Sequence, residues 1–147
     1  MPGFLFDTNV WLAMTFAAHP LHAAANGAFT RATPDEPALF CRSTQQSVLR
    51  LTSDARLAAH YGIAPLGNQG AMVRLDLLMG RPNVGFADEP PGLFPRWKAF
   101  ADLPSPSPKR WMDAYLAAFA VEAGLTMVTA DGDFNVYVPD LKLNLLK

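Results

Sequence analysis

Three segments of this 147-residue chain place acidic side chains beside or within apolar runs. Asp7 directly follows the first apolar run, Asp113 lies early in an almost wholly apolar helical stretch, and Asp131 and Asp133 follow the last β-branched run. Carboxylates that are held close together repel one another unless they bind a cation. Oxygen ligands favour Mg²⁺, for which Mn²⁺ can substitute. The sequence therefore predicts a metal site with Asp7, Asp113 and Asp131 as catalytic ligands and Asp133 as a further ligand.

Such an ion can polarise a phosphodiester, orient a water molecule and lower the pKa of that water, with a second ion stabilising the leaving oxygen in some sites. Metal-dependent hydrolysis of a phosphodiester is the chemistry that these acids predict. Each acid also has a simpler interpretation. Asp7 could be a helix N-cap, Asp113 a solvated side chain, and Asp131 and Asp133 parts of an Asp-Gly turn.

The position of Asp7 follows from the residues around it. The apolar run 3–6 predicts a strand that is covered on both faces. Asp7, Thr8 and Asn9 are residue types that cap helices, and the apolar face that begins at Val10 predicts a helix. Asp7 is therefore expected at the carboxyl end of a strand, where Thr8 and Asn9 could orient a ligand.

The rest of the chain alternates between strand and helix patterns. Because such alternation is typical of a parallel sheet with right-handed crossovers, in which ligands bind beyond the carboxyl ends of the strands, we expect the acids on one rim. Asp113 can reach this rim if its helix runs antiparallel to the sheet. The predicted strands are 3–6, 38–42, 84–86, 125–129 and an edge strand over 141–145; 87–95 is expected as a loop. The predicted helices follow Asp7, span 19–29, follow a cap at Ser43 or Thr44, span 69–79, surround Trp97 and Phe100, and span 109–123 after a Ser107 cap with Pro108 first.

Composition is consistent with one globular domain over residues 1–147, because half of the residues are hydrophobic. A formal net charge of −1 excludes a generally basic nucleic-acid coat, although it leaves a local or metal-mediated contact possible. Cys41 is the only cysteine, which excludes an internal disulfide and a thiolate zinc site and favours the cytoplasm. The apolar run 10–18 is too short to span a membrane, and no signal peptide is expected.

Three motifs together carry a family resemblance. Asp7-Thr8-Asn9-Val10-Trp11-Leu12, Asp113-Ala114-Tyr115-Leu116-Ala117-Ala118 and Thr129-Ala130-Asp131-Gly132-Asp133-Phe134 resemble, in order, the motifs of PIN-domain ribonucleases. More narrowly, the chain is similar to VapC-type toxins of bacterial toxin-antitoxin pairs. The resemblance implies a single α/β PIN domain with a doubly wound, mostly parallel sheet of four or five strands flanked by helices.

The resemblance also implies an activity and partners. It implies a Mg²⁺-dependent endoribonuclease that cleaves a restricted set of RNAs, a VapB-like antitoxin that blocks the site, and a homodimer. Asp7 and Asp113 match the principal metal ligands of the family, and Asp131 matches the acid after the fourth strand.

One family feature is missing. A Glu is usual early in the helix after the second strand, where this chain has Gln45, Gln46 and Ser47 as alternative replacements. A neutral group there should weaken ion binding. Glu122 cannot substitute, because it lies nine residues after Asp113 and projects from nearly the opposite side of that helix.

Two other functions compete with the nuclease. The missing Glu makes a non-catalytic PIN-fold binding module a serious alternative. An aspartyl phosphatase or phosphotransferase would use Asp7 as its nucleophile, although Asn9 stands where such sites often place a second Asp.

Overall fold

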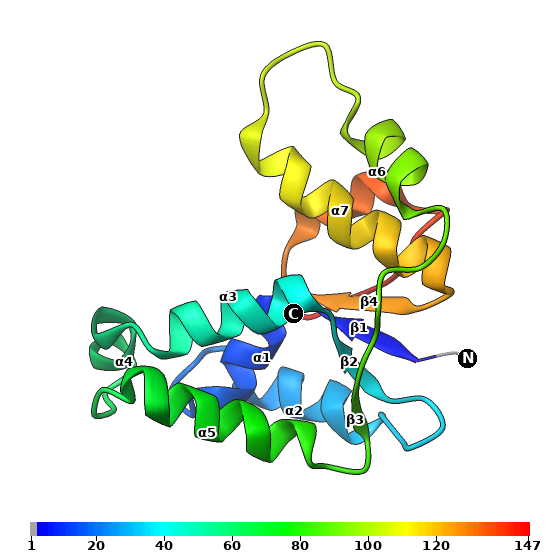
Figure 1. The fold of residues 1–147 in the computed structure, drawn as a ribbon. Coiled ribbons are helices and arrows are strands. Elements are labelled where there is room, and N and C mark those ends of the chain that lie inside the picture. The colour runs from blue at the N-terminus through cyan, green and yellow to red at the C-terminus, as the bar shows by residue number, and fades with distance from the viewer. Residues whose placement is uncertain (1–2) are drawn as a thin grey trace.

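The computed structural model describes residues 3–147, which fold into alternating strands and helices (Figure 1). In chain order the elements are β1 (Phe4–Phe6), α1 (Thr8–Thr15), α2 (His22–Thr30), β2 (Ala38–Phe40), α3 (Arg42–Thr52), α4 (Ala55–His60), α5 (Gly67–Met79), β3 (Val84–Phe86), α6 (Leu93–Ala101), α7 (Pro108–Ala123), β4 (Thr126–Thr129), the 3₁₀ helix η1 (Gly132–Tyr137) and β5 (Lys142–Leu145). The strands form one sheet in the order β3-β2-β1-β4-β5, and all four neighbouring pairs are parallel. The predicted parallel sheet is confirmed, with β5 at an edge.

Helices cover both faces of the sheet. In β1, Leu5 belongs to the core that includes side chains of α6 and α7, whereas the next residue, Phe6, belongs to the core that includes side chains of α1, α2, α3 and α5. Figure 1 shows the same division, with α6 and α7 on one side of the sheet and the other helices opposite. Alternating side chains of a strand point to opposite faces, so a strand covered on both sides must be apolar throughout. The doubly wound architecture is confirmed.

The helix that carries Asp113 has the predicted ends. Ser107 occupies the N-cap position of α7, and Pro108 occupies the first helical position, where its missing N–H has no cost. Gly124 ends the helix in the left-handed conformation (φ 71°), which glycine adopts without strain. Over residues 3–147, no helix is both long and apolar enough to cross a membrane.

Several predicted boundaries are wrong. The strand at 38–42 ends at Phe40, and α3 begins at Arg42 rather than after Ser43 or Thr44. Cys41 is the N-cap, and its N–H donates to the Thr44 hydroxyl at 2.9 Å, so the side chain three residues on completes the helix start. The helix predicted from residue 19 begins at His22 instead, because Pro20 disfavours a helical conformation in the residue before it.

The helix predicted around Trp97 and Phe100 is confirmed as α6, and α4 lies in a segment without a predicted helix. α6 begins at Leu93, inside the predicted loop 87–95, and Pro95 is tolerated because it lies in the first turn. α4 follows Asp54, whose carboxylate accepts a hydrogen bond from the Arg56 N–H at 2.9 Å.

Candidate metal centre

Asp7 lies where the central strand β1 and its neighbour β4 end. β1 pairs with β4 in a register that aligns Phe6 with Val128, so the next residues, Asp7 and Thr129, meet at the same rim. The N–H of Asp7 donates to the Val128 carbonyl at 2.9 Å, which continues the pairing. Asp7 is also the N-cap of α1, since its Oδ1 accepts from the Thr8 N–H at 2.7 Å. Capping therefore occupies one oxygen of this buried carboxylate.

The second oxygen of Asp7 is held from β4. The Thr129 hydroxyl donates to Asp7 Oδ2 at 2.8 Å, and the Asn9 amide donates to the same oxygen at 3.3 Å. Asn9 Oδ1 in turn accepts from the Ala130 N–H at 3.1 Å. The Thr8 N–H and the side chains of Asn9 and Thr129 thus orient the Asp7 carboxylate.

The electrostatic environment of Asp7 disfavours its charged form. Burial raises the pKa of Asp7 above its ordinary value, hydrogen bonds from Thr129 and Thr8 lower it, and the charges of Asp113 and Asp131 raise it further; the net direction is upward. The two other acids are therefore close enough to repel the Asp7 carboxylate. A cation bound between them would relieve this repulsion.

Three of the four predicted acids converge directly. One carboxylate oxygen from each of Asp113, Asp131 and Asp133 lies within 4.8 Å of the others. Two oxygens on opposite sides of one Mg²⁺ are about 4.2 Å apart, so small side-chain rotations would bring this set to coordination distance. In the described part of the chain, Asp7 is not one of the acids that meet within 4.8 Å, but it borders this group, because the Thr129 hydroxyl that donates to it also accepts from the Asp131 N–H.

The convergence depends on the direction of α7 and on a turn after β4. Helix α7 runs antiparallel to the strand that follows it, which brings Asp113 in its early turns to the rim where β4 ends. Asp131 caps η1, and its Oδ1 accepts from the Asp133 N–H at 2.9 Å, so the turn also presents Asp133 to the cluster. The turn interpretation and the ligand interpretation of Asp131 are thus compatible.

A lysine lies among the three carboxylates. Lys109 Nζ is 3.0 Å from Asp113 Oδ2, 2.6 Å from Asp131 Oδ2 and 3.0 Å from Asp133 Oδ2. Burial by itself raises the pKa of Asp131, but hydrogen bonds from Lys109 and from the Asp133 N–H bring it below its ordinary value. The spacing of four between Lys109 and Asp113 is typical of a helical ion pair, and this spacing is the sequence signal that indicates the contact.

The position of the missing Glu carries no acid. Gln45 accepts a hydrogen bond from Arg42 at 2.6 Å, and its amide N–H donates to Met79 Sδ at 3.9 Å, so its side chain contacts α5. Glu122 forms an ion pair with Arg96 of α6 at 2.9 Å, in agreement with its predicted distance from the site.

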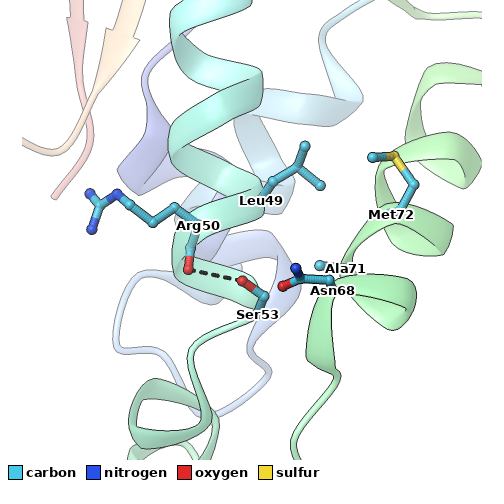
Figure 2. Close-up of a pocket in the computed structure, with 6 residues that line it drawn as sticks. All are labelled: Leu49, Arg50, Ser53, Asn68, Ala71 and Met72. Atoms are coloured by element: carbon cyan, nitrogen blue, oxygen red, sulfur yellow. Dashed lines mark hydrogen bonds between the residues drawn. The ribbon is translucent and has the colours of Figure 1, made fainter.

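Two pockets differ in the chemistry of their linings. A pocket of about 210 Å³ lies directly beside the acidic cluster and is lined by Ser107, Lys109, Arg110, Asp113, Asp133, Val136 and Tyr137. Figure 2 shows another pocket, between α3 and α5, where Leu49 and Met72 lie across the gap from each other and Arg50, Ser53, Asn68 and Ala71 complete the lining. The first pocket combines cationic and carboxylate groups suited to a metal-bound phosphate, whereas none of the four acids lines the second.

Comparison with known proteins agrees with this geometry. The PIN-domain family profile matches residues 4–138. Ribonuclease VapC41 of Mycobacterium tuberculosis is 41% identical over 134 residues, which cover 90% of this chain and 92% of the relative.

Solved structures agree at the level of the fold. The VapBC2 complex of Rickettsia felis bound to a promoter DNA fragment aligns with a TM-score of 0.70 at 12% identity over all of both chains. VapC20 of Mycobacterium tuberculosis, a toxin that cleaves the sarcin-ricin loop, aligns with a TM-score of 0.63 at 17% identity over 92% of this chain and 95% of its own. The chain belongs to the PIN-domain family and, within it, to the VapC group.

Proposed function

We propose that this protein is a Mg²⁺-dependent endoribonuclease and the toxin of a toxin-antitoxin pair, with Mn²⁺ able to replace Mg²⁺. The observation that carries the proposal is the set of carboxylates from Asp113, Asp131 and Asp133 within 4.8 Å of one another, bordered by Asp7. The ribonuclease name of the relative with 41% identity supports RNA as the substrate.

The residues of the site would have distinct roles. Asp113, Asp131 and Asp133 would hold the ion, and Asp7, fixed by Thr129 and Thr8, would complete the negative rim. A bound Mg²⁺ supplies polarisation of the scissile phosphodiester and a lowered pKa for an attacking water. Arg110 lines the adjacent pocket, although its guanidinium already donates to the Phe100 carbonyl at 2.9 Å and stacks over Tyr137. This anchoring gives it a fixed position for contact with an RNA phosphate.

Cleavage of structured RNA in Mg²⁺ or Mn²⁺ tests the proposal. We expect Asp113→Asn and Asp7→Asn to reduce the rate by more than roughly 100-fold, because loss of an ion-holding carboxylate should exceed the 10- to 100-fold effect of its supporting residues. Chelator should abolish cleavage. Asp35→Asn, which makes the same charge change in an exposed turn, serves as the control and should retain full activity. Cleavage that survives both active-site changes would refute the mechanism.

The alternative functions have distinct outcomes in the same experiment. Gln45, Gln46 and Ser47 in place of an acid favour a binding module, and that function predicts neither metal binding nor cleavage by the parent protein. A phosphatase with Asp7 as nucleophile predicts a trapped phosphoenzyme. Hydrogen bonds to both oxygens of Asp7 count against that role, because they reduce its nucleophilicity.

The proposal includes a VapB-like antitoxin and a homodimer, both in the cytoplasm. Exposed apolar side chains lie on α5 and on α7, as Leu77 and Met112 illustrate, and an antitoxin helix or a second copy would cover such surface. Co-expression with a VapB-like protein should yield a complex that no longer cleaves RNA. Light scattering of the isolated chain should give the mass of a dimer, and a monomer at micromolar concentration would contradict this part.

A further inference from the structure

The Lys109 ammonium occupies the position that a metal ion would need. Its Nζ contacts Oδ2 of Asp113, Asp131 and Asp133 at 2.6–3.0 Å, and these carboxylates are the ones that meet within 4.8 Å. A Mg²⁺ bound by the same oxygens would lie about 2.1 Å from them. The ammonium and the ion would then share ligands at a separation where two cations repel strongly, so their occupancies are mutually exclusive.

Helix electrostatics do not explain this lysine. Lys109 is the second residue of α7, and a cation at a helix N-terminus is disfavoured by the partial positive charge of the first-turn N–H groups. The three carboxylates offset that cost. What Lys109 neutralises is therefore the acid cluster rather than the helix terminus.

The Lys109 ammonium can also move away from the three carboxylates. The Lys109 side chain is 60% exposed and lines the pocket beside the cluster, so its ammonium can rotate into water without disturbing the core. Asp113 and Asp131 are much less exposed, at 17% and 27%, whereas Asp133 is 73% exposed. The geometry thus combines two partly buried ligands and one exposed ligand with a removable cation.

We propose that Lys109 is an internal counter-ion of the metal site, which holds the three carboxylates together and exchanges with the divalent cation when that cation binds. This inference rests on the proposed function, because it requires the divalent-cation site. Lys109 acts as a positioning residue that sets the affinity of the site for metal. Its removal should strengthen metal binding, which is the opposite of the effect of losing a phosphate contact or a ligand.

Calorimetric titration of the full chain with Mn²⁺ tests the proposal without reference to activity. We expect Lys109→Met to lower the dissociation constant by roughly five- to tenfold, since each partly exposed ion pair is weak but three converge here. Lys109→Arg should restore a value within about threefold of the parent. Lys142→Met, which removes an equal charge from the exposed edge strand β5, should leave the dissociation constant unchanged.

A second measurement uses the unaltered protein. The side-chain NMR signal of Lys109, identified by its absence from the Lys109→Arg spectrum, should shift towards the values of exposed lysines as Mg²⁺ saturates the site. A Mg²⁺-saturated protein in which this signal does not move, or a Lys109→Met protein that binds Mn²⁺ no more tightly than the parent, would overturn the exchange while leaving the nuclease proposal intact. Absence of Mn²⁺ binding in both the parent and Lys109→Met would overturn the metal site and the exchange together.

Discussion

Replacement of Thr129 by Val isolates the contact that joins the ends of β1 and β4 at the site. Thr129 is fully buried, and its hydroxyl donates to Asp7 Oδ2 at 2.8 Å and accepts from the Asp131 N–H at 3.1 Å. Valine has nearly the same shape, so the substitution removes the hydrogen bonds without opening a cavity. The difference between the parent and Thr129→Val therefore measures the contribution of the hydroxyl alone.

The magnitude follows from the two groups with the shorter bonds, because the Asn9 amide, which also donates to this hydroxyl at 3.4 Å, keeps its contact with Asp7 Oδ2 at 3.3 Å. A hydrogen bond to a charged group contributes about 1.5–3 kcal/mol, and a backbone N–H that loses its partner costs about 1 kcal/mol or more. Thr129→Val should therefore lower the free energy of unfolding by roughly 3 kcal/mol. The pKa of Asp7, which burial raises and the Thr129 hydrogen bond lowers, should rise further.

Urea denaturation at pH 7 in chelator measures the effect, and Thr52→Val provides a matched control. Thr52 is also buried, but its hydroxyl donates at 2.7 Å to the Val48 carbonyl of its own helix, so the same substitution there should cost about 0.5 kcal/mol. If the two variants differ by less than about 1 kcal/mol, the Thr129 contact does not hold the rim as argued.

Three further predictions concern the charge of Asp7 and packing at two other positions of the fold. The folded-state pKa of Asp7 lies above its ordinary value of 3.8, so its contribution to stability is fully present below pH 3.8 and is lost as the pH rises through the folded pKa. Asp7→Asn in chelator should gain stability relative to the parent between pH 4 and pH 7, and a difference independent of pH in thermal unfolding would contradict this. Trp11→Ala should cost about 4 kcal/mol in urea unfolding, because Trp11 is fully buried and stacks on Phe40 at 4.0 Å between ring centroids. Trp11→Phe should cost less than half as much, since it also removes an indole N–H that lacks a partner. Gly92→Ala should cost about 1–2 kcal/mol, since φ is +83° and the new Cβ would lie 2.5 Å from Glu122 Oε1; thermal unfolding of the double variant with Glu122→Ala should recover part of that loss.

The sequence predicted the sheet and the rim because each depends on local pattern. Apolar strands alternating with helices imply a parallel sheet, and acids that follow strands in such a sheet must share an edge. The position of Asp113 was predictable for a similar reason. The helix before a parallel strand runs antiparallel to that strand, so the early turns of the helix lie near the rim where the strand ends. These relations required no knowledge of side-chain contacts.

Other features depend on tertiary contacts that periodicity does not encode. Cys41 is an unusual N-cap, and it starts α3 because the Thr44 hydroxyl accepts from its N–H, which moved the helix start from the predicted Ser43 or Thr44. The sequence alone does not distinguish Lys109 from a surface lysine, because only the fold brings Asp131 and Asp133 to it. The sequence around Asp133 is equally compatible with a turn and a ligand, and only the fold brings its carboxylate beside those of Asp113 and Asp131.

The neutral segment of α3 and the lysine of α7 act on the site in the same direction. Replacement of the family's Glu by Gln45, Gln46 or Ser47 removes a negative charge, and Lys109 offsets another within the cluster. Both changes reduce the attraction for a divalent ion, because that attraction depends on the net charge of the ligands. A site of four acids that also holds one ammonium is therefore expected to bind metal weakly. Its affinity should rise when a neutral side chain replaces Lys109. Replacement of Gln45, Gln46 or Ser47 by Glu, at whichever position faces the cluster, should also tighten Mn²⁺ binding, and it does so through a residue other than Lys109. If both routes tighten Mn²⁺ binding, net charge sets the affinity of the site; if only the Glu does, the affinity depends on ligand number instead.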